Sequence, residues 1–237
     1  MALENPSTRN YRGYIRYLHD RDGERGREWF SVSVQPDGAR VLRAQCEMDD
    51  EYLQRDVIYA LNGAWQPCEA FVRLVQHGVH RGSAWFLFDA FGISCEALTS
   101  AEGRVRQRRE LGCHARLFAP HPLQCDGWQA MAYDFSGGPG RQRIDPCANS
   151  SARHDGASGP LIGIVRKDIE YIGEERITVG AGSFIARHMK IHPLMPEMAH
   201  WTPLEFWVTG HDCQILRMRW DLLESTYELA NISGDWN

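Results

Sequence analysis

The sequence lacks the short motifs that identify the common nucleotide-binding and hydrolytic folds. It has no Gly-x-Ser-x-Gly, no Walker-type glycine loop and no Gly-x-Gly-x-x-Gly. Serine hydrolysis on an α/β scaffold, NTP chemistry and dinucleotide binding therefore lack support. A basic bias is also missing, because the formal charge is -5. We therefore expect no nucleic-acid partner, since such partners are usually bound by basic domains.

Long apolar runs are absent as well. Residues 1–9 lack the apolar core of a signal peptide, and no later segment approaches the ~18 consecutive apolar residues of a membrane span. We expect a cytoplasmic protein with no membrane partner. None of the seven cysteines forms a Cys-x-x-Cys pair, a pattern that fits neither a zinc ribbon nor a disulfide framework. Reduced thiols, packed as small core residues, are predicted instead.

Short alternating segments, separated by turn signals, fill the first 110 and the last 77 residues. Pro36-Asp37-Gly38 and Asn62-Gly63 are typical of the turns between such strands. The pattern predicts an all-β fold, a large antiparallel barrel or a strongly curled sheet of about 12 strands. The expected strands are 14–18, 28–35, 39–48, 54–61, 68–76, 83–88, 92–99, 104–111, 161–171, 176–179, 183–191, 204–209, 214–221 and 225–229.

The segment 111–160 differs from the rest of the chain, because it is rich in His, Gly and Pro. We expect one helix within 120–133, followed by a long irregular loop over 134–160. The interpretation is a single β-barrel domain over 1–237, with 111–160 as a lid-like insertion over the mouth. A barrel wider than about eight strands leaves volume that side chains do not fill, so a ligand cavity is predicted.

The last third of the chain resembles a known group of proteins. Residues 177–188 read ITVGAGSFIARH, followed by PLEFWV at 203–208 and ILRMRW at 215–220. This part is similar to the end of certain uncharacterised bacterial barrel families, in which a strand, an Ala-Gly-x-Phe turn and Trp- and Arg-containing strands close a large half-open barrel. Their architecture is similar to the lipoprotein-carrier fold. The resemblance implies that fold and an apolar cavity.

The candidate catalytic residues fall in two clusters, one in the insertion and one late in the chain. Histidine can take and return a proton near neutral pH, and a carboxylate can orient it. We predict that His121 and His188 flank the cavity as a proton-transferring pair. Asp126 or Glu205 would orient one of them, and Tyr59 or Tyr133 would hydrogen-bond a polar oxygen of the substrate.

Aromatic side chains are the candidate walls of the cavity, because aromatic residues bury the most surface per residue. The predicted ligand-binding residues are Trp85, Phe86, Trp128, Tyr133 and Trp207. A metal site is a weaker alternative, built from His188, His192 and His200. On one strand the first two would stand roughly 13 Å apart, which is too far for one ion unless the strand ends between them. We expect no metal and no cofactor.

Two classes of function remain. In the first, the protein is a cofactor-independent lyase, isomerase or decarboxylase that acts on an apolar, aromatic small molecule. In the second, it is a non-catalytic carrier of a hydrophobic small molecule. Convergence of at least two ionisable side chains within ~3 to 4 Å in one pocket would favour catalysis. The sequence leaves the oligomeric state open, with a homodimer as one alternative to the monomer.

Overall fold

The computed structural model describes residues 7–151, 153, 155–198 and 200–236. Within them lie fifteen strands, one short α-helix and four short 3-10 helices. The first eight strands are β1 (Arg9–His19), β2 (Gly23–Val34), β3 (Arg40–Met48), β4 (Leu53–Leu61), β5 (Pro67–Gln76), β6 (Val79–Asp89), β7 (Gly92–Thr99) and β8 (Gly103–Glu110). The later strands are β9 (Leu117–Ala119), β10 (Gly140–Asn149), β11 (Gly163–Val179), β12 (Gly182–Pro193), β13 (Leu204–Val208), β14 (Ile215–Trp220) and β15 (Ser225–Gly234). The helices are α1 (Leu123–Trp128), η1 (Gln129–Ala132), η2 (Phe135–Gly137), η3 (Pro196–Met198) and η4 (Asp221–Leu223).

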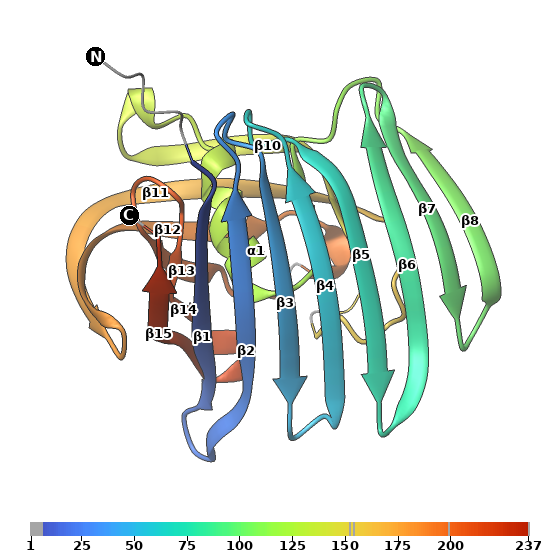
Figure 1. Ribbon diagram of the computed structural model, residues 1–237, viewed down its shortest axis with the longest axis horizontal. Helices are drawn as coiled ribbons and strands as arrows, with labels where there is room; N and C mark the ends of the chain where they lie inside the picture. Colours follow the sequence, from blue (N-terminus) through green and yellow to red (C-terminus); the bar gives the residue numbers. More distant parts are fainter. Residues whose placement is uncertain (1–6, 152, 154, 199, 237) are drawn as a thin grey trace.

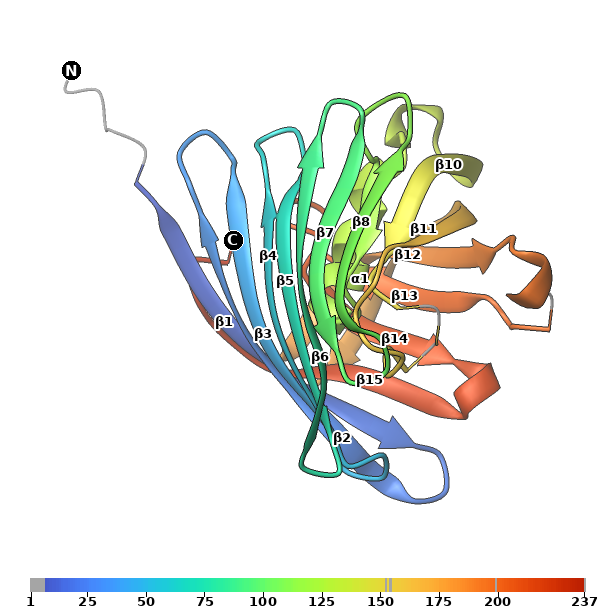
Figure 2. The same ribbon diagram turned by 90° about the vertical axis from the view of Figure 1, so that its right-hand side faces the viewer.

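All of these strands belong to one curled sheet (Figures 1 and 2). Strands β1 to β8 form a meander, and β1 also pairs with β15, from which the sheet continues back through β14 to β9. Every pairing is antiparallel except that of β9 with β10. The sheet is not closed, because β8 and β9 are its two edges. The two parts of the chain therefore share one sheet, which has 15 strands rather than about 12.

Alternation of apolar and polar residues explains why the early segments become strands. On β4, every second residue from Leu53 to Leu61 is buried, and the residues that alternate with them are more exposed. Such a period of two places one face of a strand on the core. The turn after β4 forms because the Asn62 side chain accepts hydrogen bonds from two backbone N–H groups further along, at 3.0 Å each.

Part of the insertion belongs to the sheet itself, which differs from the helix and irregular loop expected for 111–160. Its strands β9 and β10 extend the sheet, and only α1 and η1 match the helix expected within 120–133. A register shift between Ile144 and Cys147 breaks the alternation of β10. The sequence pattern of this strand therefore predicts a loop. None of the described helices has the length and apolarity needed to cross a membrane.

The inside of the curl is filled by helix α1 and by aromatic side chains. Helix α1 lies on the concave side of the sheet, against β13 and β14 (Figure 2). Phe118 lies at the centre of an aromatic group, with ring centroids 4.9 Å from Phe86, 5.0 Å from Phe88 and 6.0 Å from Tyr59. The interior is therefore mostly core, and two cavities that share lining residues lie beside α1.

Candidate active site

Three polar side chains interrupt the apolar inner face of the early strands. Glu28 on β2, Cys46 on β3 and Arg55 on β4 lie directly opposite one another in the strand register. Residues paired in this way point to the same face of a sheet. All three side chains are buried, with Arg55 only 3% exposed. The row therefore carries a carboxylate and a guanidinium into the interior.

Glu28 fixes helix α1 to the sheet. One of its carboxylate oxygens accepts hydrogen bonds from the Leu123 backbone N–H at 2.7 Å and from the Tyr17 hydroxyl at 3.0 Å. The other oxygen accepts from the Gln124 backbone N–H at 3.2 Å. Burial raises the pKa of Glu28, and these hydrogen bonds act against that rise. The start of α1 is thus held at a defined place inside the curl.

His121 lies just before α1 in a conformation that non-glycine residues rarely adopt. It stands between two prolines with a φ of 81°. Backbone strain of this kind persists where the surroundings impose it, and it often marks functional sites. A side chain on Gly156 would collide with the Arg55 guanidinium and would meet His121 Cγ at 3.0 Å. The loop at Gly156 therefore packs closely against the Arg55 guanidinium and the His121 ring, which are neighbours.

Asp126 is held by a short polar relay. Gln129 Nε2 donates a hydrogen bond to Asp126 Oδ1 at 2.6 Å, and Lys167 Nζ on β11 donates to Gln129 Oε1 at 2.8 Å. An ammonium group can only donate, so it fixes which end of the Gln129 amide faces Asp126. Lys167 is itself buried. The relay therefore orients the carboxyl group and places a positive charge near it.

Two cavities meet at these residues. The larger has a volume of about 420 Å³ and is bounded by the β1–β2 and β3–β4 turns and by η4. The smaller has a volume of about 120 Å³ and is bounded by β11, β12 and η3. Arg55 lines the larger cavity, and Lys167 lines the smaller one. The residues that line both are His121, Asp126, Leu204 and Trp220.

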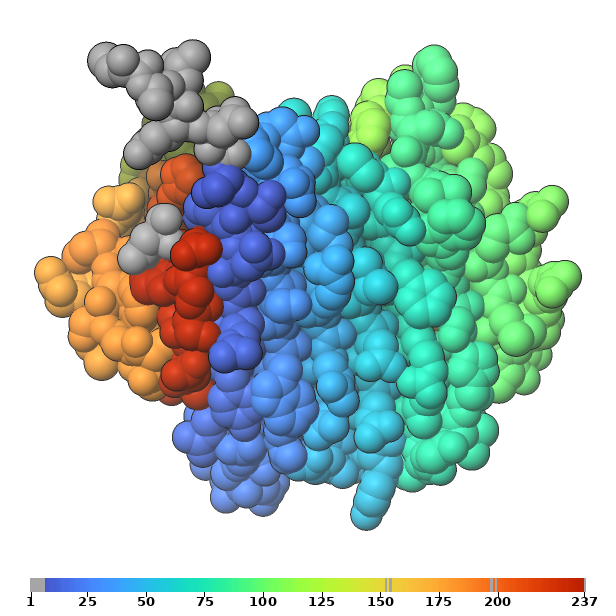
Figure 3. Space-filling view, in the orientation of Figure 1, coloured from blue at the N-terminus to red at the C-terminus, as the bar shows by residue number. Residues whose placement is uncertain are grey.

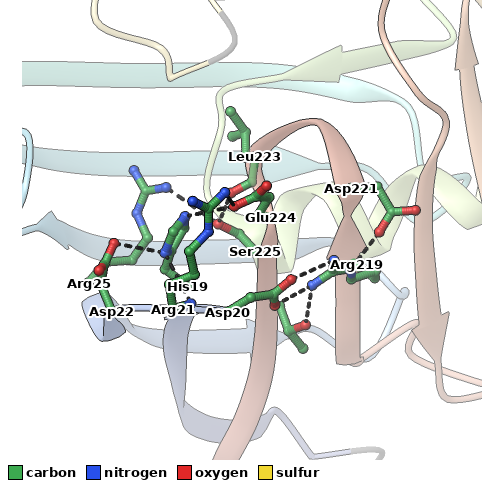
Figure 4. Close-up of polar contacts among 11 residues, drawn as sticks. His19, Asp20, Arg21, Asp22, Arg25, Arg219, Asp221, Leu223, Glu224 and Ser225 are labelled. Carbon is green, nitrogen blue, oxygen red and sulfur yellow. Dashed lines mark hydrogen bonds and ion pairs between the residues drawn. The ribbon is translucent and has the colours of Figure 1, made fainter.

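Ion pairs connect the elements at one side of the larger cavity, and Figure 4 shows these contacts. Arg219 donates to both oxygens of Asp20 at 2.6 and 2.9 Å, and to Asp221 at 2.6 Å. His19 Nδ1 lies 2.9 Å from the Asp22 carboxylate. These contacts join the β1–β2 hairpin to η4, so this wall of the cavity is preformed.

The pKa values of Asp126 and His121 are shifted in opposite directions from their ordinary values. Burial raises the pKa of Asp126 to about 7, and the Lys167 charge acts against this rise. Burial lowers the pKa of His121 to about 3, and the Arg55 charge adds to the decrease. Near neutral pH the carboxyl therefore exists in both forms, while the imidazole is neutral. Such a carboxyl can either donate or accept a proton.

The structure brings together only part of the predicted catalytic set. His121 and Asp126 line the same cavities, but His188 and Glu205 lie on the other face of the sheet. On β12 and β13, Met189 pairs with Phe206 and both are fully buried, whereas the next pair, His188 with Trp207, points the opposite way. The predicted pairing of His121 with His188 across one cavity is therefore wrong.

His188 and Glu205 nevertheless form a cluster of their own on that outer face. His188 Nε2 lies 3.4 Å from Glu205 and its Nδ1 lies 3.2 Å from Glu175. Its ring stacks on Trp207 at a centroid distance of 4.4 Å. His192 pairs separately with Glu170 at 2.7 Å. The alternative metal site is not formed, and no group of three or more potential ligands occurs in the described ranges.

The predicted aromatic residues do not surround one ligand pocket, which corrects that expectation. Tyr59, Phe86, Trp128 and Tyr133 belong to the core, and the Tyr133 hydroxyl donates to the Gly138 carbonyl at 2.8 Å. Trp85 is 46% exposed on the outer face of β6. Figure 3 shows the outer face formed by the early strands. None of these residues, nor Trp207, lines either of the two cavities.

Three residues of the site were absent from the sequence prediction. Glu28, Arg55 and Lys167 are charged, yet each occupies an alternating position whose neighbours are apolar, as between Leu53 and Val57 on β4. A charge in that position is either buried or at the end of the core. A charged residue at an alternating position that is otherwise apolar is the sequence signal that could have identified these three residues.

Comparison with known proteins supports the fold. No protein family matches the chain, and no curated protein matches it either. The structure is similar to a β-barrel-like protein of the domain of unknown function DUF1849 from Brucella abortus, with a TM-score of 0.61 and 9% identity over 96% of this chain and 98% of that one. A DUF1089 family protein from Pseudomonas aeruginosa gives a TM-score of 0.44 and 11% identity, over 83% of this chain and 90% of that one. The similarity to the first of these proteins shows that the fold is β-barrel-like.

Proposed function

We propose that the protein is an acid/base enzyme that moves protons on a small molecule bound where the two cavities meet. The observation that carries this proposal is the position of Asp126 and His121, which line both cavities from the same short segment. In this role Asp126 takes a proton from the substrate and returns it. His121 hydrogen-bonds the substrate as a neutral imidazole, and Gln129 keeps the Asp126 carboxyl in place.

The chemistry of the pair supports isomerisation or elimination. A base with a pKa of about 7 can remove a proton from a carbon next to an electron-withdrawing group at neutral pH, and its conjugate acid can protonate the product. Return of the proton to another carbon gives an isomer. Loss of a leaving group before that return gives the product of a lyase. Both reactions need only side chains that the site contains.

The cavity walls favour a polar substrate over the apolar aromatic one that the sequence suggested. The larger cavity is lined by the carboxylates of the hairpin turns as well as by Arg55 and His121. Its volume of about 420 Å³ is within the range of small-molecule sites. The aromatic side chains that would have bound an apolar ring lie in the core or on the outer face.

Exchange with heavy water tests the proposal without knowledge of the substrate. The protein is incubated in D₂O with a panel of small polar molecules that carry acidic C–H groups, and the deuterium incorporated is measured by proton NMR. We expect protein-dependent incorporation, or conversion, of at least one compound. The activity should fall by about 100-fold or more in Asp126→Asn. The control variant Glu205→Gln, on the outer face, should keep it. Equal activity of wild type and Asp126→Asn would refute the proposal.

A further inference from the structure

Arg55 is a buried cation for which the described residues provide no ion pair. Its side chain is 3% exposed, and Nη2 donates a hydrogen bond to the Asp155 backbone carbonyl. Among the described residues, Nε has no hydrogen-bond partner. A buried charge is costly unless it is paired and hydrogen-bonded. Arg55 therefore has unused capacity to bind an anion, at the wall of the larger cavity.

His121 adds a second unused polar atom beside it. His121 Nε2 is buried and has no hydrogen-bond partner in the described part of the chain. The imidazole and the guanidinium both pack against Gly156, so they are adjacent, and both line the larger cavity. A neutral imidazole donates one hydrogen bond, from the ring nitrogen that carries its proton. Two donors of this kind, side by side, match the two oxygens of one planar anion.

We propose that Arg55 and His121 bind the carboxylate of a small-molecule ligand. This inference rests on the proposed function, because it names the substrate class of the same site. The Arg55 guanidinium and the His121 imidazole, which both line the larger cavity, each donate a hydrogen bond to the carboxylate. Charge-assisted hydrogen bonds from a guanidinium to a carboxylate are short and strong. The rest of the molecule extends past Asp126, since His121 and Asp126 line both cavities.

The surrounding charges favour a carboxylate over a phosphate. One guanidinium balances one negative charge, whereas a phosphate group carries about 1.5 to 2 at neutral pH. The larger cavity is also bounded by many acidic side chains, which repel a dianion more strongly than a monoanion. These acidic residues are Asp22, Glu24, Asp49, Asp50, Glu51, Asp126 and Asp155.

NMR titration of the whole protein tests this inference directly. Acetate and benzoate are the probes, with acetamide and benzamide as uncharged counterparts of the same shape and inorganic phosphate as the competing anion. We expect the carboxylates to shift the Arg55 Nε–H and His121 ring signals in a saturable way. Arg55→Met should weaken that binding by about 10-fold or more, since hydrogen bonds to charged groups contribute about 1.5–3 kcal/mol. Arg43→Met, at an exposed position on β3, should leave it unchanged.

Three results would overturn the inference: amides that bind as well as the carboxylates, phosphate that binds more tightly than either, or unchanged affinity in Arg55→Met. Circular dichroism of Arg55→Met shows whether this variant is folded, and Arg55→Lys, which keeps the charge but loses the fork of donors, should bind with intermediate affinity. Carboxylate binding without deuterium exchange in wild type would refute the proposed function alone. Exchange without carboxylate binding would refute this inference alone.

Discussion

The sheet carries two groups built from the same kinds of residue, one on each face. On the inner face, His121 and Asp126 line two cavities beside α1. On the outer face, His188 lies between Glu175 and Glu205 and stacks on Trp207. The inner carboxyl has a neutral amide as its hydrogen-bond partner, whereas the outer carboxylates face cations and solvent. A histidine near a carboxylate therefore indicates chemistry only when the face of the sheet is known.

Burial explains why the two groups should behave differently. A charge on the inner face loses its hydration, so the pKa of Asp126 rises to about 7 and that of His121 falls to about 3. Glu175 on the outer face is half exposed, and water screens such ion pairs. The inner group can therefore exchange protons near neutral pH, and the outer group serves as a surface contact between β11, β12 and β13.

Replacing each of the two histidines by glutamine gives the largest expected difference in activity between the two faces. His121→Gln should lower the rate of deuterium incorporation by about 100-fold or more, because a hydrogen bond made in the transition state is lost or misplaced. The matched variant His188→Gln should stay within about twofold of wild type, since His188 touches neither cavity. Steady-state rates on the same substrate, with circular dichroism to check folding, measure both. A larger loss in the outer variant would place the chemistry on the outer face.

The pH dependence of stability should separate the two inner residues. The pKa of Asp126 in the folded protein is above its ordinary value of 3.8, so its stabilising contribution is complete below about pH 4 and is lost as the pH rises through about 7. The pKa of His121 is below its ordinary value of 6.5, so its contribution is complete above about pH 6.5 and is lost as the pH falls through about 3.

Each variant should therefore reveal the effect of the remaining residue. In His121→Gln the free energy of unfolding should fall between about pH 4 and 7, by at most about 4 kcal/mol, since each pKa unit is worth about 1.4 kcal/mol. In Asp126→Asn it should rise with pH over the same range more steeply than in wild type. Urea unfolding at several pH values measures these slopes. Parallel curves for both variants and wild type would show that neither pKa is displaced.

The early half of the fold was more predictable from sequence than the site. The eight segments expected before residue 111 correspond to β1–β8, because turn chemistry and alternation are local signals that agree there. Strand β12 is different: Ala186 and Met189 are both fully buried although they stand three residues apart. The alternation changes phase between them, beside a register shift in β11, so the face of His188 could not be predicted.

The site itself depends on contacts between distant parts of the chain. Glu28 meets the Leu123 backbone across 95 positions of sequence, and Arg55 meets the carbonyl of Asp155 across 100. Nothing local to either segment specifies these partners. His121 and Asp126 were predicted because they lie in one short polar segment. Arg55 was missed because its partner in the site comes from another element.

Glu28 provides the next comparison, between a buried carboxylate and an exposed one. Glu28→Ala leaves the Tyr17 hydroxyl and the Leu123 and Gln124 N–H groups without their acceptor. Each unsatisfied buried group costs about 1–3 kcal/mol, so we expect a loss of about 3 kcal/mol or more in the free energy of unfolding. Glu28→Gln, which keeps one acceptor oxygen, should lose less. Urea unfolding at pH 7 measures both, and a loss below about 1 kcal/mol in Glu28→Ala would show that Glu28 does not anchor α1.

The smallest effect is expected on the outer face. His188→Ala removes the stacking on Trp207 and the contacts with Glu175 and Glu205, all at partly exposed positions. Exposed ion pairs contribute about 0–1 kcal/mol, and an aromatic contact adds about 0.5–1.5 kcal/mol. We therefore expect a loss of about 1 kcal/mol, of which the ionic part should disappear in 1 M salt while the stacking part remains. Urea unfolding at low and high salt measures the two parts. A loss above about 3 kcal/mol would mean that His188 contributes as much to stability as Glu28. The proposed difference in energetics between the inner and outer faces would then be wrong.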